Sequence, residues 1–370
     1  LTRASLTELT AAELLTDVIP SIEMVKFAKN GSNVTTAAVK LSRAYTNRRY
    51  IAIPSEQPFF SFDDWFIGKT NMSRGALDET AQYTLQFNFG DISSLARLFE
   101  RYPDAIAAVM LEPATSLLPC SPKCVGELRC ESPCTTCKQK DENFLHQVRQ
   151  LCDKNGALLI FDEMITGFRW HLGGAQSYFG VQPDLTTLGK AMANGFSVAA
   201  VGGRREVMKL GSIIDKGKER TFLLSSTHGS EMSGLGAMIE TVKVYRSQPV
   251  CEQLWQFGGQ LKRELNALAG SKGIAEFFRV VGPDVALGIE VRDGSGKISQ
   301  ELRTLFSQEM IKNNVLMPWI SVSTAHSPKE LEETLIAADN ALDTVKKALN
   351  GSVADFLVGH VVQPVFRKYN

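Results

Sequence analysis

Residues 157–163 read Ala-Leu-Leu-Ile-Phe-Asp-Glu, and this stretch decides the fold. The five apolar residues 157–161 predict a strand that is buried on both faces, as the strands of parallel sheets are. Two acids, Asp162 and Glu163, follow where the strand ends. In open α/β sheets, ligands bind beyond the carboxyl ends of the strands. We therefore expect a mostly parallel sheet with a ligand site beside Asp162.

Short apolar strands alternate with helical patterns on both sides of this stretch, which is typical of an α/β fold covered by helices on both faces. The strands are expected at 24–28, 50–53, 105–111, 185–188 and 198–201, the helices at 6–19, 34–45, 141–154 and 231–246, and an irregular stretch at 54–89. From about Gly270 the pattern changes, and the segments 279–291, 315–318 and 328–349 indicate a smaller α+β lobe. We expect a large domain at 1–269 and a small one at 270–370.

Composition excludes several classes of function. The chain has 370 residues, 44% of them hydrophobic, which favours a folded protein over a disordered one. Lys+Arg and Asp+Glu both number 40, so no overall positive charge attracts nucleic acid or an anionic membrane. No apolar run approaches the ~20 residues of a membrane span, and no signal peptide opens the sequence. We expect no nucleic-acid or membrane partner and a cytoplasmic location.

Three features at predicted strand ends carry the chemistry. The turn 30–33, Asn-Gly-Ser-Asn, precedes a helix and could bind an anion through its backbone N–H groups, although most such turns are only turns. Asp162 could meet a cationic partner or simply cap the next segment. Lys190 lies among small residues and could act as an amine nucleophile, or it could be an ordinary solvated lysine. Together these residues match the needs of pyridoxal phosphate, namely a lysine for the aldehyde, an acid for the ring nitrogen and an anion site for the phosphate.

The segments 161–169, 183–185 and 189–195 carry a family resemblance. They read Phe-Asp-Glu-Met-Ile-Thr-Gly-Phe-Arg, Pro-Asp-Leu and Gly-Lys-Ala-Met-Ala-Asn-Gly. This pattern resembles the class III (fold type I) pyridoxal phosphate-dependent aminotransferases, in the subgroup that contains glutamate-1-semialdehyde 2,1-aminomutase. The resemblance covers essentially the whole chain. It implies the fold type I architecture, a mostly parallel central sheet with helices on both faces plus a smaller α+β C-terminal lobe.

The resemblance also implies roles for single residues. Lys190 would form the internal aldimine with the cofactor and shuttle the proton, and Asp162 would pair with the ring nitrogen. Two departures from the family pattern are Phe59, where a tyrosine usually stacks on the ring, and Asn33, where many members have an acid. The cofactor-binding set implied by the resemblance comprises Gly31, Ser32, Asn33, Phe59, Glu112, Asp162, Ile165, Lys190 and Thr227, the last reaching the phosphate of a partner subunit.

The function implied is amino transfer between small molecules. An amino donor, for which L-glutamate is the expectation, would pass its amine through Lys190 chemistry to a carbonyl acceptor. The resemblance also implies a homodimer with active sites at its interface. One alternative is intramolecular transfer of the glutamate-1-semialdehyde 2,1-aminomutase type. Another, from a different class, is an inactive protein of this fold that acts as a metal-binding interaction module.

A cysteine-rich insert interrupts the family pattern at 119–140. Five of the seven cysteines lie here, with the spacing C-x3-C-x5-C-x3-C-x2-C. Four thiolates suit a structural zinc ion, and an iron–sulfur cluster is the less favoured alternative. A reduced surface loop and disulfides are the other readings. We predict that four of these five residues bind zinc: Cys120, Cys124, Cys130, Cys134 and Cys137.

Overall fold

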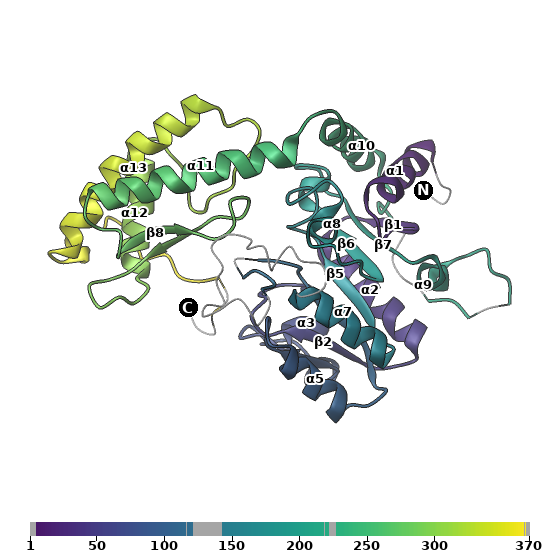
Figure 1. Cartoon of the computed structure of the whole chain (residues 1–370). Coiled ribbons are helices and arrows are strands. Elements are labelled where there is room, and N and C mark those ends of the chain that lie inside the picture. Colours follow the sequence, from purple (N-terminus) through teal and green to yellow (C-terminus); the bar gives the residue numbers. More distant parts are fainter. Residues whose placement is uncertain are drawn as a thin grey trace. The chain divides into compact units, whose positions relative to one another are not determined.

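The computed structural model describes residues 5–115, 117–120, 143–217, 219–221, 227–365 and 367. The chain divides into two compact units, of which the first holds the described residues up to Cys251 together with residue 367, and the second holds 252–365 (Figure 1). The junction lies in the first turn of helix α11 (Val250–Ser271), whereas the domain boundary expected from the sequence lies in its last turn.

A seven-stranded sheet, counted over the described residues, organises the first unit in the order β1-β7-β6-β5-β4-β2-β3. The neighbouring strands run parallel, except that β7 is antiparallel to both β1 and β6. The strands are β1 (Met24–Ala28), β2 (Tyr50–Pro54), β3 (Thr84–Phe87), β4 (Ile106–Leu111), β5 (Leu158–Asp162), β6 (Leu185–Leu188) and β7 (Ala199–Gly203). The predicted mostly parallel sheet is confirmed.

Helices cover both faces of this sheet. Ala199 and Val201 of β7 pack in one core with helix α2 (Gly31–Thr46), while Ala200 packs in the other core with α1 (Leu6–Val18) and α10 (Met232–Ser247). Successive residues of a strand point to opposite faces, so these two cores lie on opposite sides of the sheet. The first unit also contains α3 (Asp64–Ile67), α4 (Asp78–Ala81), α5 (Ile92–Arg101), α7 (Phe144–Asn155), α8 (Gly174–Phe179), α9 (Arg205–Met208) and the 3₁₀ turns η1 (Lys190–Met192) and η2 (Lys209–Gly211).

Two local predictions need correction. The stretch 54–89 is not irregular, because it contains β3 and the short helices α3 and α4. β3 is a four-residue edge strand, too short for its alternation to stand out. Helix α2 begins at Gly31 and not at Val34, because Asn30 has an extended backbone and its side chain accepts the Asn33 N–H at 3.0 Å.

The second unit is an α+β arrangement, as expected. Its strands β8 (Phe278–Val281) and β9 (Gly288–Val291) form an antiparallel pair. Helix α12 (Gln300–Lys312) packs against α13 (Pro328–Leu349), and the 3₁₀ turn η3 (Val353–Asp355) follows. A capping box between Ser327 and Glu330 starts α13, with Pro328 in its first turn.

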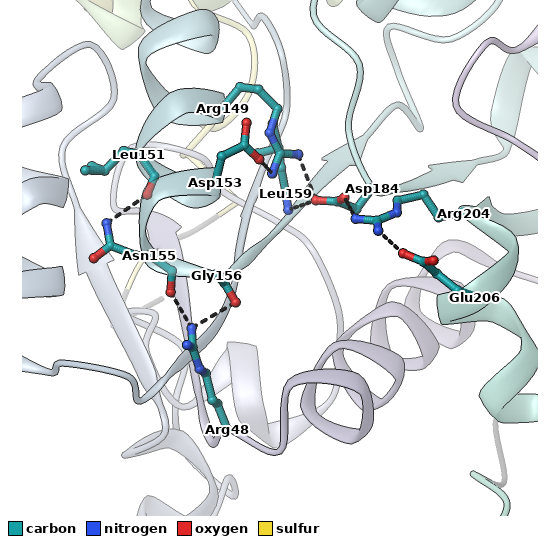
Figure 2. Close-up of polar contacts among 10 residues, drawn as sticks. All are labelled: Arg48, Arg149, Leu151, Asp153, Asn155, Gly156, Leu159, Asp184, Arg204 and Glu206. Atoms are coloured by element: carbon teal, nitrogen blue, oxygen red, sulfur yellow. Dashed lines mark hydrogen bonds and ion pairs between the residues drawn. The ribbon is translucent and has the colours of Figure 1, made fainter.

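A buried carboxylate ties the amino ends of β5 and β6 together (Figure 2). Asp184, just before β6, accepts hydrogen bonds from the guanidinium groups of Arg149 and Arg204, each at 2.7 Å. The same carboxylate accepts the Leu159 N–H of β5 at 2.7 Å. Nearby, Arg48 donates to the carbonyl oxygens of Asn155 and Gly156 at 2.7 and 2.9 Å, at the carboxyl end of α7. These contacts lie at the sheet edge opposite to the strand ends where the site is expected.

Across the described residues, none of the helices combines the length and the apolarity that crossing a membrane requires.

Candidate functional site

A cavity of about 590 Å³ lies at the carboxyl ends of β4, β5 and β6, beside the amino end of α2. All of its walls come from the first unit. The lining residues are Lys29, Asn30, Gly31, Ser32, Pro58, Phe59, Phe60, Phe62, Glu112, Asp162, Met164, Ile165, Gly189, Lys190, Phe196, Ser197, Val198 and Ala199. The three strand-end features singled out in the sequence therefore meet around one space.

One end of the cavity is the start of α2. Gly31 and Ser32 are the first two residues of this 16-residue helix, where backbone N–H groups lack partners within the helix and the helix dipole favours an anion. Ser32 is buried, and its hydroxyl oxygen accepts the Phe62 N–H at 3.1 Å. This bond fixes the hydroxyl beside the cavity and leaves its proton available to donate.

Met164 explains two glycines in the cavity wall. A Cβ atom on Gly31 would lie 3.2 Å from the Met164 sulfur, and one on Gly189 would lie 2.7 Å from it. A larger residue at Gly189 would displace the Met164 side chain, because Cβ atoms do not approach this closely. Met164 thus packs the start of α2 closely against the strand end that carries Lys190.

Asp162 is the carboxylate at the end of β5, and it is only 3% exposed. Its Oδ1 accepts the Met164 N–H and the Thr187 hydroxyl, both at 3.0 Å. Burial raises the pKa of Asp162 to about 6, while these two hydrogen bonds and the Lys190 charge oppose the rise. The side chain is therefore mainly ionised at neutral pH and suited to a cationic partner.

Glu163, the next residue, has a structural role. It is fully buried and accepts hydrogen bonds from the Thr166 hydroxyl, the backbone N–H groups of Ala175 and Gln176, and the Gln176 side chain, at 2.6–3.2 Å. Burial nevertheless raises the pKa of Glu163 above its ordinary value. Adjacent strand residues face opposite sides of the sheet, so only Asp162 lines the cavity.

Lys190 follows β6 in an unusual backbone conformation. Its φ is +43°, in the left-handed region that residues with a Cβ rarely adopt. The side chain is exposed and lines the cavity together with Asp162 and Glu112. An unfavourable backbone conformation of this kind persists only where the surrounding structure offsets its free-energy cost. Such residues cluster at functional sites.

Aromatic and aliphatic side chains form the remaining walls. Phe59 and Ile165 line the cavity and are 44% and 45% exposed. Phe62 and Phe196 add two further exposed rings. A flat ring could pack between apolar walls of this kind.

Seven of the nine predicted cofactor-binding residues line the cavity, the exceptions being Asn33 and Thr227. Asn33 lies within the first turn of α2, where its N–H bonds to Asn30. Thr227 is exposed in a turn outside the cavity wall. Asn30 lies in the turn predicted as the anion site but was not in the predicted cofactor-binding set, although its position directly before Gly-Ser is an N-cap signature. The sequence prediction also missed Thr187 and Lys29, the latter paired with Glu231 at 2.6 Å.

The predicted metal site cannot be placed, because Cys124, Cys130, Cys134 and Cys137 lie outside the described residues. Of the five, only Cys120 is described, and it is partly exposed. Within the described part of the chain, no three His, Cys, Asp or Glu side chains gather as metal ligands would. Zinc, or an iron–sulfur cluster, at these cysteines stays a prediction.

Comparison with solved structures supports the fold. The FumI protein of Sphingopyxis sp. MTA144, solved in its PLP internal aldimine form, superposes with a TM-score of 0.79 at 24% identity, over 95% of this chain and 78% of that one. An omega-transaminase from Sphaerobacter thermophilus gives a TM-score of 0.76 at 23% identity, over 94% and 80%.

Comparison with curated sequences and family models identifies the family. The model of class-III aminotransferases matches residues 137–308. Glutamate-1-semialdehyde 2,1-aminomutase from Desulforamulus reducens is 32% identical over 359 residues, which cover 92% of this chain and 78% of the relative. The enzyme of the same name from Alkaliphilus oremlandii is 30% identical with the same coverage. The chain therefore belongs to the class-III aminotransferase family, in the subgroup of relatives named glutamate-1-semialdehyde 2,1-aminomutase.

Proposed function

We propose that the chain binds pyridoxal phosphate in this cavity and transfers an amino group from L-glutamate to a carbonyl acceptor. The observation that carries the proposal is the convergence of Lys190, Asp162 and the start of α2 on one cavity of about 590 Å³. Each meets a different chemical need of the cofactor, and the three come from separate parts of the sequence. The first unit would be the cofactor-binding domain.

The residues fit the cofactor in charge and in polarity. The buried Asp162 carboxylate would hold a protonated ring nitrogen, and the open N–H groups at Gly31 and Ser32 would hold the phosphate. Phe59 and Ile165 would pack on the ring. When bound, the cofactor supplies an aldehyde for amine exchange and an electron-withdrawing ring.

Lys190 would do the remaining chemistry. Its amine would react with the cofactor aldehyde, and once displaced by a substrate amine it would carry the proton away from the substrate α-carbon. Asp162 would keep the proton on the ring nitrogen throughout. The apolar walls would limit the access of water to the reacting atoms.

The absorption spectrum of the purified protein tests this proposal. We expect a visible band from bound pyridoxal phosphate, which should bleach when L-glutamate is added without an acceptor. Lys190→Ala should abolish turnover, whereas Lys40→Ala, which removes an exposed lysine of α2, should leave it unchanged. A Lys190→Ala protein with full turnover would rule the mechanism out.

Intramolecular amino transfer is the second candidate, and the identity of 30–32% to relatives named glutamate-1-semialdehyde 2,1-aminomutase favours it. Such an enzyme needs no external donor. A band that persists with L-glutamate, together with turnover of glutamate-1-semialdehyde, would select this candidate. The inactive interaction module is not favoured, because the cavity retains both Lys190 and Asp162.

We also infer a homodimer, as the family resemblance implies. Thr227 is exposed and lies outside the cavity wall of its own subunit, so a partner subunit's phosphate site could be within its reach. Sedimentation would give the oligomeric state, and Thr227→Ala should weaken cofactor binding if the assignment is right. A monomer with full cofactor affinity would contradict it. The cytoplasmic location stays a prediction from the sequence.

A further inference from the structure

A second buried carboxyl, Glu112, lines the cavity beside Asp162. Glu112 follows β4 directly, and its predecessor Leu111 pairs with Phe161, the residue before Asp162. The two carboxyls therefore occupy neighbouring positions at adjacent strand ends. Glu112 is only 6% exposed.

The backbone of Glu112 is fixed by a single side chain. The Gln57 amide nitrogen donates to the Glu112 carbonyl at 2.8 Å, and the Glu112 N–H donates to the Gln57 amide oxygen at 2.8 Å. Gln57 is itself only 3% exposed, so water does not compete for this pair of bonds. The position of Glu112 in the wall is therefore determined independently of any ligand.

The Glu112 carboxyl differs from the other buried acids in having no hydrogen-bond or ion-pair partner among the described residues. Asp162 accepts two hydrogen bonds and Glu163 accepts four. A buried polar group without a partner is costly, and most such groups in folded proteins are satisfied. Since Glu112 faces the cavity, a ligand or a water molecule bound there would supply the partner.

The charged groups around the cavity influence whether the Glu112 carboxyl is protonated or ionised. The ionisable residues of its wall are Lys29, Glu112, Asp162 and Lys190, and Lys29 is already paired with Glu231. Burial raises the pKa of Glu112 to about 8, with a further rise from the Asp162 charge and an opposing effect of Lys190. Asp162 has two hydrogen bonds that favour its charged form, whereas Glu112 has none. Burial, the neighbouring Asp162 charge and the absence of donors to Glu112 among the described residues therefore all favour the neutral form of this carboxyl.

We propose that Glu112 is the neutral acid of this site, protonated while Asp162 is ionised, and that its carboxyl O–H donates a hydrogen bond to an oxygen of the bound ligand. The phenolic oxygen of pyridoxal phosphate is an acceptor of this kind. The donor role toward that cofactor rests on the proposed function, whereas the protonation of Glu112 does not.

Infrared difference spectroscopy tests the protonation state in the full-length protein, with and without cofactor. At neutral pH the spectrum of wild type minus Glu112→Gln should show the C=O band of a protonated carboxyl, and the band should vanish as the pH rises past about 8. Glu100→Gln, the same change at an exposed position of α5, should show no such band. If the glutamine variant fails to fold, Glu112→Asp keeps the acid and should shift the band. A difference spectrum without a protonated-carboxyl band would overturn the proposal.

Cofactor affinity tests the donor role. Glu112→Gln keeps an N–H donor and should bind pyridoxal phosphate within about threefold of wild type, whereas Glu112→Leu should bind about tenfold more weakly, as expected for one lost hydrogen bond. Thermal unfolding would show that both variants fold. Equal affinities of the glutamine and leucine variants would refute hydrogen-bond donation. If wild type binds no pyridoxal phosphate at all, the proposed function fails, and the infrared result still decides whether Glu112 is neutral.

Discussion

Removing the Thr187 hydroxyl should change how cofactor affinity depends on pH. Thr187 is fully buried, and its hydroxyl donates to Asp162 Oδ1 at 3.0 Å. A hydrogen bond to a charged group contributes about 1.5–3 kcal/mol, and one pKa unit corresponds to about 1.4 kcal/mol. Thr187→Val keeps the shape of the side chain and should raise the pKa of Asp162 by at least about one unit, from about 6 to about 7.

The expected loss of affinity follows from the fraction of Asp162 that is ionised before binding. If the ligand needs the carboxylate, affinity is reduced by the factor 1 + 10^(pKa − pH) in each protein. The ratio of wild-type to variant affinity should then be about twofold at pH 7, about fivefold at pH 6 and close to tenfold at pH 5. Above pH 8 the two proteins should bind alike. Titrations shared by both proteins, including those of the cofactor itself, cancel in this ratio.

The preceding residue supplies a matched control. Thr186 is also fully buried on β6, but it faces the other side of the sheet, where its hydroxyl contacts the Ser21 hydroxyl at 2.8 Å. Thr186→Val should lower the free energy of unfolding by about 1 kcal/mol without altering the pH dependence of affinity. Titrating pyridoxal phosphate into each protein from pH 5 to pH 8, followed by absorbance, measures the ratio. The same ratio at every pH, or equal effects of the two variants, would refute the assigned role of Thr187.

Three further changes test the structure around the site. Asp184→Asn leaves the largely buried Arg149 without its main counter-charge, so urea denaturation should show a loss of about 2–4 kcal/mol in the free energy of unfolding. Gly174→Ala should lower the melting temperature markedly, because φ is +78° and the new Cβ would lie 2.6 Å from both carboxylate oxygens of Glu163. The pKa of Glu112 is raised from 4.5 to about 8, so the native state holds a proton that the unfolded chain releases. Stability should therefore fall as the pH rises through this range, by up to about 1.4 kcal/mol per pH unit, and Glu112→Gln should lose that slope.

The parts of the site that the sequence predicted are those set by local pattern. Asp162 and Lys190 each follow a short apolar run, and the ends of parallel strands share one edge, so their proximity could be inferred without coordinates. The start of α2 was placed three residues late, because periodicity does not locate a helix terminus to within one turn. Of the two asparagines of the turn 30–33, Asn30 lines the cavity and Asn33 does not.

Other parts depend on contacts between distant segments and could not be read from the sequence. Gln57 lies 55 residues from Glu112, in a stretch expected to be irregular, and nothing in its neighbourhood signals a buried side chain. Thr187 gains its role only through the register that places it opposite Asp162, and a shift of one residue would present Thr186 instead. Hydrogen-bond partners that support a site are set by tertiary structure even when the reactive residues stand in a recognisable motif.

The pairing register of β5 and β6 connects the Asp184 network at their amino ends with Asp162 at their carboxyl ends. At the amino end, two hydrogen bonds join Asp184 and Leu159. The Asp184 N–H donates to the Leu159 carbonyl at 2.8 Å, and the Asp184 side-chain carboxylate accepts the Leu159 N–H at 2.7 Å. The arginine pair holds that carboxylate in place (Figure 2). Three residues further along each strand, the same register brings Thr187 opposite Asp162. A fixed starting point for β5 and β6 thus sets the hydrogen bond that keeps Asp162 ionised. The Asp184 network, remote from the cavity, would support the chemistry of the site by preventing a slip between these two strands.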